Sequence, residues 1–147
     1  MMKMTDSKKL LKNAGVGATI NRASVIECIA RSDHALSAQE ILHHVRCRHT
    51  INKVTLYRIL DLFVEKNIVH RNSTGDRAFR YCLGNYGTGN NHCHFYCTKC
   101  GNMECVEMSR IPVDTAVWEK RLGQQINHIE IRLDGVCNQC CTKKGLS

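Results

Sequence analysis

Five side chains able to bind a metal ion occur within ten residues, between His92 and Gly101. Cys97 and Cys100 are separated by two residues and followed by Gly101, which is the spacing of a zinc knuckle. The short loop lets both thiolates reach one ion, and the glycine relieves the turn behind them. A knuckle supplies two of four ligands, and the same spacing recurs near the end of the sequence. The two pairs predict a structural zinc site formed by Cys97, Cys100, Cys137 and Cys140.

A second group of ligand residues flanks a glycine- and asparagine-rich segment, residues 84–91. After this segment, His92 and His94 are two residues apart, so both imidazoles lie on one face of an extended chain. Before it, an expected β-hairpin brings His70 close to Cys82. If Cys82 and His70 were the only candidate ligands, Cys82 would be read as a small buried hydrophobe and His70 as a surface residue. The presence of His92 and His94 as two further candidates favours a metal site instead. We predict a regulatory zinc ion that bridges two domains, bound by His70, Cys82, His92 and His94.

The chemical types of the candidate ligands indicate which metal binds, and their number indicates how many sites exist. A thiolate discriminates against harder ions, which favours Zn²⁺ over Fe²⁺ or Mn²⁺ without excluding Cu²⁺. Cys93 and His128 are candidates for a third site, although His128 shares the polar face of an expected strand with Glu130 and Arg132. Solvent exposure is the ordinary expectation there. We expect about two Zn²⁺ per chain, and no role is assigned to Cys28, Cys47, Cys105 and Cys141.

The first 83 residues have the pattern of a winged helix. Apolar residues at helical spacing predict helices over about 21–31, from 37 onward, and over about 52–66. The second begins with a capping box, Ser37-Ala38-Gln39-Glu40, and leaves His43 and His44 on a solvated face. Extended segments at 68–71 and 78–83 predict a hairpin. In a winged helix the last helix enters the major groove and the hairpin follows phosphates. The expected DNA contacts are Lys53, Thr55, Tyr57, Arg58, Arg71 and Arg77, with Arg80 also near phosphate.

The rest of the chain is expected to form a hinge linker, residues 84–91, and a second domain, residues 92–147. Its pattern predicts short strands at 94–97 and 103–108, a helix at 113–122 and a strand at 126–133. A small sheet leaves edges that another copy can pair with, so this domain is expected to mediate dimerisation. The fold class is therefore α+β: an N-terminal winged-helix DNA-binding domain and a small α/β domain with a Cys₄ zinc site.

Charge and cysteine content restrict the class of protein. The net charge is +8, and residues 1–81 hold 14 basic and 7 acidic side chains, whereas residues 82–147 hold 7 and 6. The first half is thus the part suited to a polyanion. Ten cysteines could form a disulfide scaffold, but the N-terminus has no apolar signal region and no run of 18 apolar residues occurs. We expect a cytoplasmic protein with reduced, metal-binding thiols and no membrane contact.

These motifs together resemble the ferric uptake regulator (Fur) family, and within it the zinc uptake regulators (Zur). The resemblance covers nearly the whole length. It is carried by Leu36-Ser37-Ala38-x-Glu40-Ile41, Thr55-Leu56-Tyr57-Arg58-x-Leu60, His92-x-His94-Phe95-x-Cys97-x-x-Cys100-Gly101, His128-Ile129-Glu130 and Gly135-x-Cys137-x-x-Cys140.

The resemblance implies a homodimeric repressor that binds double-stranded operator DNA, with Tyr57 near bases and Arg58 near phosphate. Cys82 stands where iron-sensing relatives tend to have a carboxylate, so with His70 it looks like the zinc-sensing branch. The sequence departs from the family where Asn91 and Cys93 replace the usual His and Asp. Pro112 falls where a glutamate is usual, and these departures all concern the third site.

Two other functions are weighed against zinc-dependent repression of zinc-uptake genes. A redox, peroxide or other-metal sensor of the same family would act through spare thiols such as Cys93, Cys105 and Cys141. A zinc enzyme is suggested by His128-x-Glu130 followed by two cysteines, which partly matches the signature of nucleobase deaminases. The proline of that signature is replaced by Val136, and the interval leaves little room to fold both halves onto one zinc. We expect neither catalysis nor a small-molecule substrate.

Overall fold

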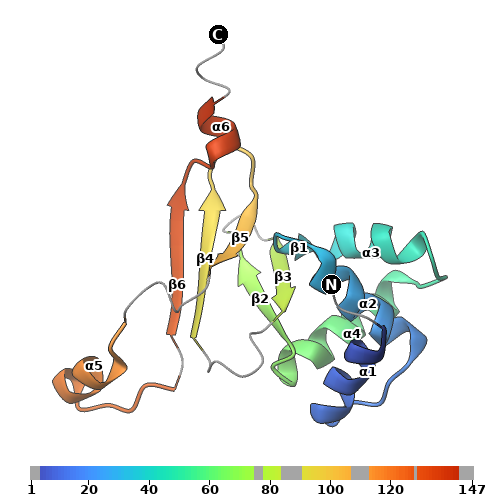
Figure 1. Ribbon diagram of the computed structural model, residues 1–147, viewed down its shortest axis with the longest axis horizontal. Coiled ribbons are helices and arrows are strands. Elements are labelled where there is room, and N and C mark those ends of the chain that lie inside the picture. The colour runs from blue at the N-terminus through green and yellow to red at the C-terminus, as the bar shows by residue number, and fades with distance from the viewer. Residues whose placement is uncertain (1–3, 75–77, 84–90, 107–112, 128, 143–147) are drawn as a thin grey trace. The chain divides into compact units, whose positions relative to one another are not determined.

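The computed structural model describes residues 4–74, 78–83, 91–106, 113–127 and 129–142, and combines helices with two small sheets in an α+β chain (Figure 1). Residue contacts divide the chain into two compact units, Met1–Gly84 and Asn85–Ser147. The predicted linker lies outside the described residues except for Asn91, which begins a strand. None of the helices in the described ranges is long and apolar enough to cross a membrane.

Helices make up most of the first unit: α1 (Met4–Asn13), α2 (Ile20–Arg31), α3 (Ala38–Arg46) and α4 (Lys53–Glu65). Polar side chains fix where three of them begin. Thr19, Ser37 and Asn52 each accept a hydrogen bond from the backbone N–H three residues later. Glu40 completes the capping box of α3 by accepting a bond from the Ser37 N–H at 2.7 Å. The helix starts expected from the sequence are therefore confirmed.

The wing is a three-stranded sheet of β1 (Leu36–Ser37), β2 (Val69–Ser73) and β3 (Phe79–Leu83). Strand β3 lies in the middle and is antiparallel to both others. Strands β2 and β3 form the predicted hairpin, in which His70 is the register neighbour of Cys82. Helices α2, α3 and α4 together with this sheet make a winged helix, as expected.

Apolar side chains from all these elements form one core in the first unit. Phe63 and Leu60 on α4, Ile26 on α2 and Ile41 on α3 are almost fully buried. Their spacing along each helix places them on a single face, which explains why the helices pack together. Most of the buried apolar side chains of the described chain belong to this unit, so it has a substantial core of its own.

The second unit contains a three-stranded sheet with the order β5-β4-β6, formed by β4 (Asn91–Cys97), β5 (Met103–Val106) and β6 (Ile129–Gly135). Strand β4 is antiparallel to β5 and parallel to β6. Two helices are also described, α5 (Thr115–Leu122) and α6 (Asn138–Thr142). Gly135 allows a close approach at the end of the sheet, because a Cβ there would lie 3.1 Å from the ring of Phe95.

The last strand differs from its prediction. Its start was expected at Ile126, whereas β6 begins at Ile129. The backbone N–H of Ile126 instead donates to the Glu119 carboxylate at 2.9 Å, so this residue is held by the end of α5. Periodicity alone could not detect that contact, because Ile126 continues the alternation of apolar residues.

Candidate metal centres and nucleic-acid interface

The strongest candidate metal centre is a cluster of four cysteines in the second unit. Cys97 ends β4, Cys100 lies in the turn that follows, and Cys137 and Cys140 lie just before and within α6. The four Sγ atoms all lie within 4.8 Å of one another, and those of Cys100 and Cys137 are 3.8 Å apart. The two separated cysteine pairs predicted to share a zinc ion are thus brought to one point.

Backbone pairing positions these thiols. The parallel register of β4 and β6 places Cys97 beside Gly135, two residues before Cys137. Thr98 secures this junction because both its N–H, at 2.8 Å, and its hydroxyl, at 3.1 Å, donate to the Gly135 carbonyl. Gly101 closes the turn with a φ of 73°, a backbone conformation that favours glycine. A local turn brings the two cysteines of each C-x-x-C motif together, and the pairing of β4 with β6 brings the two motifs together.

The electrostatics of the cluster suit a cation. The backbone N–H of Cys137 donates to Cys97 Sγ at 3.3 Å, and such bonds lower the pKa of Cys97 to about 6. Hydrogen bonding to the neighbouring Cys137 thiol raises the pKa of Cys140 to about 12, since four thiols this close cannot all ionise without a counter-charge. Four sulfurs in a tetrahedral set favour zinc or iron–sulfur chemistry. The residues present therefore fit a closed structural zinc site.

The predicted regulatory ligands come from two places in the chain. In the first unit, His70 and Cys82 are neighbours across β2 and β3, and Cys82 is 4% exposed. Asn72 donates to Cys82 Sγ at 3.6 Å, a contact that orients the thiol. In the second unit, His94 is 2% exposed on β4. His92 is two residues earlier on the same strand, and only its backbone is described.

The tentative third site has one described member. Cys93 is fully buried and alternates with His94 along β4, so it faces the other side of the sheet. Burial raises the pKa of its thiol. His128 lies outside the described residues. Within the described ranges, Cys93 belongs to no group of three or more potential ligands, so the third site stays a prediction.

The exposed face of α4 carries four of the predicted DNA contacts. Lys53, Tyr57 and Arg58 are exposed, and the Lys53 ammonium lies 5.9 Å from the centre of the Tyr57 ring. Thr55 is half-buried beside them. The sequence did not single out Val54, which is 60% exposed on this helix. An apolar side chain there suits contact with a thymine methyl group, and its exposed place in the helical repeat was the signal that could have identified it.

The wing carries one described phosphate candidate. Arg71 is exposed, stacks 5.0 Å over the Phe79 ring and bonds Asp61 at 3.3 Å. Arg77 lies outside the described residues. Arg80 does not fit the phosphate contact expected of it, because its Nη1 donates to the Glu40 carboxylate at 3.3 Å and to the Ala35 carbonyl at 3.4 Å. It ties the wing to the start of α3 instead.

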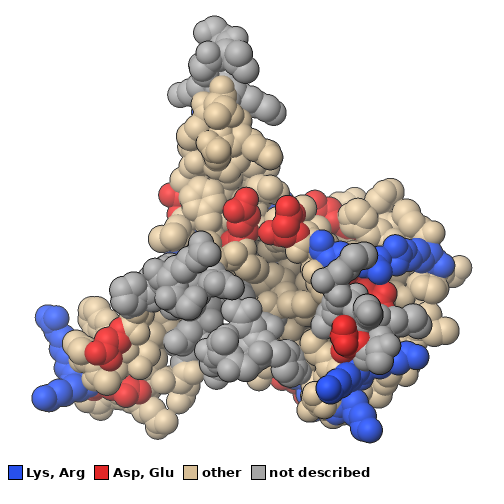
Figure 2. Space-filling view, viewed as in Figure 1, with Lys and Arg blue, Asp and Glu red and all other residues tan. Residues whose placement is uncertain are grey.

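The charge distribution agrees with a polyanion-binding first unit. Lys and Arg side chains form several clusters over the helices of this unit on the face shown in Figure 2, interrupted by a few acidic side chains. Fourteen of the 21 basic residues precede residue 82. A positive surface of this kind attracts DNA regardless of its sequence, whereas base reading is the role predicted for side chains on α4.

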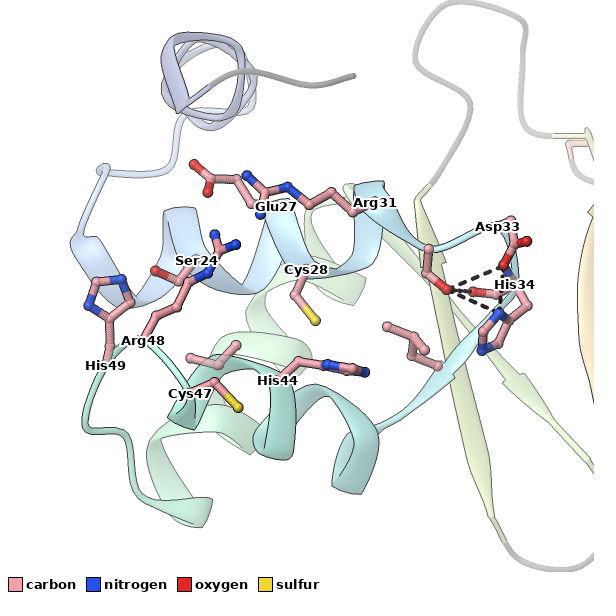
Figure 3. Close-up of a pocket in the computed structure, with 13 residues that line it drawn as sticks. Ser24, Glu27, Cys28, Arg31, Asp33, His34, His44, Cys47, Arg48 and His49 are labelled. Atoms are coloured by element: carbon pink, nitrogen blue, oxygen red, sulfur yellow. Dashed lines mark hydrogen bonds and ion pairs between the residues drawn. The ribbon is translucent and has the colours of Figure 1, made fainter.

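A pocket of about 520 Å³ lies between α2 and α3 in the first unit (Figure 3). Cys28 points from α2 toward α3 in this view, and Cys47, at the end of α3, donates to the His43 carbonyl at 3.3 Å. Burial raises the pKa of Cys28 to about 11, although two nearby arginines oppose the shift. Its thiol therefore stays protonated at neutral pH, which makes it a poor nucleophile.

Comparison with known proteins places these features in context. Residues 13–134 match the model of the ferric uptake regulator family. The ferric uptake regulation protein of Bacillus subtilis (strain 168) is 26% identical over 140 residues, which span 93% of each chain. That of Yersinia pestis is 28% identical over 140 residues, spanning 91% of this chain and 90% of the relative.

Solved structures show the same fold. A zinc uptake regulator complexed with zinc and DNA matches with a TM-score of 0.73 at 21% identity, covering 97% of this chain and 95% of that one. The ferric uptake regulator of Helicobacter pylori, described as having three functional metal-binding sites, matches with a TM-score of 0.72 at 20% identity and covers 95% of both chains. At these identities the likeness establishes the architecture, and the metal must be argued from the ligands.

Proposed function

Because the chain belongs to the ferric uptake regulator family of transcription regulators, we propose that it is a zinc-responsive repressor of zinc-uptake genes. It binds double-stranded operator DNA as a homodimer when loaded with zinc, in a reducing compartment such as the cytoplasm. Each chain carries about two Zn²⁺. The structural ion is bound by Cys97, Cys100, Cys137 and Cys140, and the regulatory ion by His70, Cys82, His92 and His94.

The single observation that carries the zinc assignment is the buried Cys82 thiol beside His70 in the wing. A thiolate is a poor ligand for Fe²⁺ or Mn²⁺ but suits Zn²⁺, particularly with imidazole as the other donor. The named relatives are ferric regulators, whereas one structural neighbour is a zinc uptake regulator complexed with zinc and DNA. Proteins of this fold thus include regulators named for iron and for zinc. The donor atoms near Cys82 support zinc in this chain.

The two ions have different tasks in this proposal. The Cys₄ ion leaves no open position and remains bound, because it stabilises a unit whose described residues include few buried apolar side chains. The regulatory ion draws ligands from before and after the linker, so its binding restricts how the winged helix is presented to DNA. A typical coupling free energy of about 1–3 kcal/mol corresponds to a 5- to 150-fold increase in operator affinity.

Exposed apolar side chains on one helix support the homodimer. Helix α5 has no buried residue, and Val117, Trp118 and Leu122 on it are 59%, 48% and 58% exposed. A group of large exposed apolar side chains often marks a surface that binds another protein. A second copy is the partner that an operator with two half-sites requires.

Titration of operator DNA with ligand variants tests the proposal. His70→Ala, Cys82→Ala and His94→Ala should each abolish most of the zinc-dependent gain in affinity, because each removes a ligand of the signal ion. His43→Ala is the matched control, since His43 is exposed on α3 and belongs to no predicted site. Operator affinity that follows zinc equally well in the three ligand variants would refute the sensing role.

A redox or peroxide sensor of the same family is the alternative function. Cys47, Cys105 and Cys141 are exposed and accessible to oxidants. Such a sensor would release DNA when treated with peroxide and would ignore a chelator, which is the reverse of the result expected here. Catalysis has less support, because the family consists of regulators and the Cys137 and Cys140 thiols are shared with Cys97 and Cys100.

A further inference from the structure

The pocket between α2 and α3 lies entirely within the first unit (Figure 3). None of the residues that line it is a predicted metal ligand or DNA contact. Its volume of about 520 Å³ is in the range of small-molecule sites. We propose that this pocket binds a small organic monocarboxylate with an apolar body. The site is additional to the proposed function and does not depend on which metal the chain senses.

The inner wall of the pocket is apolar. Leu36 and Val45 belong to the buried core of the first unit and also border the pocket. Cys28 points from α2 toward α3 in Figure 3, and its thiol, with a pKa of about 11, adds uncharged, polarizable surface. An apolar ligand body would remove this wall from water, whereas a small hydrated ion would not.

Two guanidinium groups border the same pocket. Arg31 ends α2 and Arg48 follows the end of α3, and both are exposed. Both charges act at the Cys28 thiol, where they oppose the rise of its pKa. Within the described residues, neither arginine side chain has an ion pair or a hydrogen bond. They are therefore available to an anion, and a guanidinium pairs well with a carboxylate.

The acidic side chains that line the pocket already have partners. The Glu27 carboxylate accepts a hydrogen bond from the Ser7 hydroxyl on α1 at 3.2 Å. Asp33 bonds His34 Nδ1 at 2.8 Å, and this bond lowers the pKa of Asp33. In Figure 3, Asp33 lies at the opposite end of the pocket from Arg48. The Arg48 end therefore favours an anionic group of the ligand.

Ser24 supplies a second polar contact at the same end. Arg48 extends from the segment after α3 toward Ser24 on α2 in Figure 3, and Ser24 is half-buried. A carboxylate there would accept hydrogen bonds from the guanidinium and the hydroxyl, and its apolar body would lie over Cys28 and Val45. A DNA phosphate could bond the same arginine but would leave the apolar wall uncovered, which favours the organic ligand.

Calorimetric titration of the full-length, zinc-loaded chain with octanoate tests the site. Octanoate should bind at least about tenfold more tightly than acetate, which lacks the apolar body, and than octanamide, which lacks the charge. Arg48→Ala should weaken octanoate binding at least about tenfold, and Arg48→Lys should lose less because the positive charge remains. The backbone amide NMR signals of Cys28 and Val45 should shift when octanoate binds, which locates the ligand in this pocket.

Arg121→Ala is the matched control, because it removes an exposed arginine from α5 in the second unit and should leave octanoate affinity unchanged. Far-ultraviolet circular dichroism verifies the fold of each variant. Equal affinity for octanoate and octanamide, or no octanoate binding at millimolar concentration, would overturn the proposal. Octanoate affinity unaffected by Arg48→Ala, with operator affinity lowered, would also overturn it and assign Arg48 to DNA phosphate. The zinc dependence of operator binding is measured separately, so none of these results bears on the sensing role.

Discussion

At the scale of single residues, the cysteines of this chain are distinguished by their surroundings. Four converge on one point, Cys82 is buried beside His70, Cys93 is buried in the second sheet, and Cys28 is held protonated in a pocket. Sequence spacing identified the four because each pair is local. It does not show that Cys105 and His94 are neighbours, because their closeness arises from the pairing of β4 with β5 and leaves no pattern in the sequence.

The structural cluster yields a prediction for stability. Cys97→Ser should abolish the tightly bound zinc and lower the free energy of unfolding of the second unit by at least about 3 kcal/mol, because zinc binding and folding of such a unit are one process. The buried apolar side chains described in this unit are Cys93, Cys97 and Met103, too few to replace the ion. Zinc analysis and urea unfolding followed by the fluorescence of Trp118, the single tryptophan, measure both effects.

Cys141→Ser is the matched control for this experiment. It removes an exposed thiol next to Cys140, outside the cluster, and should keep both the zinc and the stability. If Cys97→Ser retained zinc and unfolded at the wild-type urea concentration, the structural assignment of the cluster would be wrong.

At the scale of elements, the helices and the wing hairpin were predictable from the sequence, whereas contacts between elements far apart in the chain were not. Ser37, Glu40 and Asn52 mark helix starts through bonds to residues three positions away, so the sequence contains the whole signal. The parallel pairing of β4 with β6, which aligns Cys97 with Gly135, joins segments far apart in the chain. Arg80 is a second contact that the sequence does not reveal. It was expected to reach phosphate, and it bonds Glu40, 40 residues earlier in the chain, instead.

The capping box of α3 gives a prediction at this scale. Ser37→Ala should destabilise the first unit by about 1 kcal/mol, because it removes the acceptor for the Glu40 N–H. Ser24→Ala, inside α2 where no cap is needed, is the control and should change stability by only a few tenths of a kcal/mol. Urea unfolding followed by far-ultraviolet circular dichroism compares them, and equal midpoints for the two variants would contradict the role of the cap.

The stability that the capping box contributes to the first unit should also depend on pH. Burial tends to raise the pKa of Glu40, but hydrogen bonds from Ser37 and the charge of Arg80 outweigh it and hold the folded-state value below the ordinary 4.5. The stabilising contribution is therefore complete at neutral pH and is lost as the pH falls through the lowered pKa.

At the scale of the whole molecule, the proposed function draws on two units with different chemistry. The first has a large apolar core, most of the basic side chains and the exposed face of α4. The described part of the second has few buried apolar residues, a cluster of metal ligands and a helix with exposed apolar side chains. In the proposed function, a zinc ion that takes ligands from both units couples the zinc concentration to DNA affinity.

Zinc content measured before and after mild chelation, with operator affinity determined on the same samples, tests this central claim most directly. The account predicts two zinc ions per chain, of which chelation readily removes one. Operator affinity should then fall by about 5- to 150-fold and recover when zinc is restored. A chain that holds a single zinc ion, and whose operator affinity is the same before and after chelation, would contradict it.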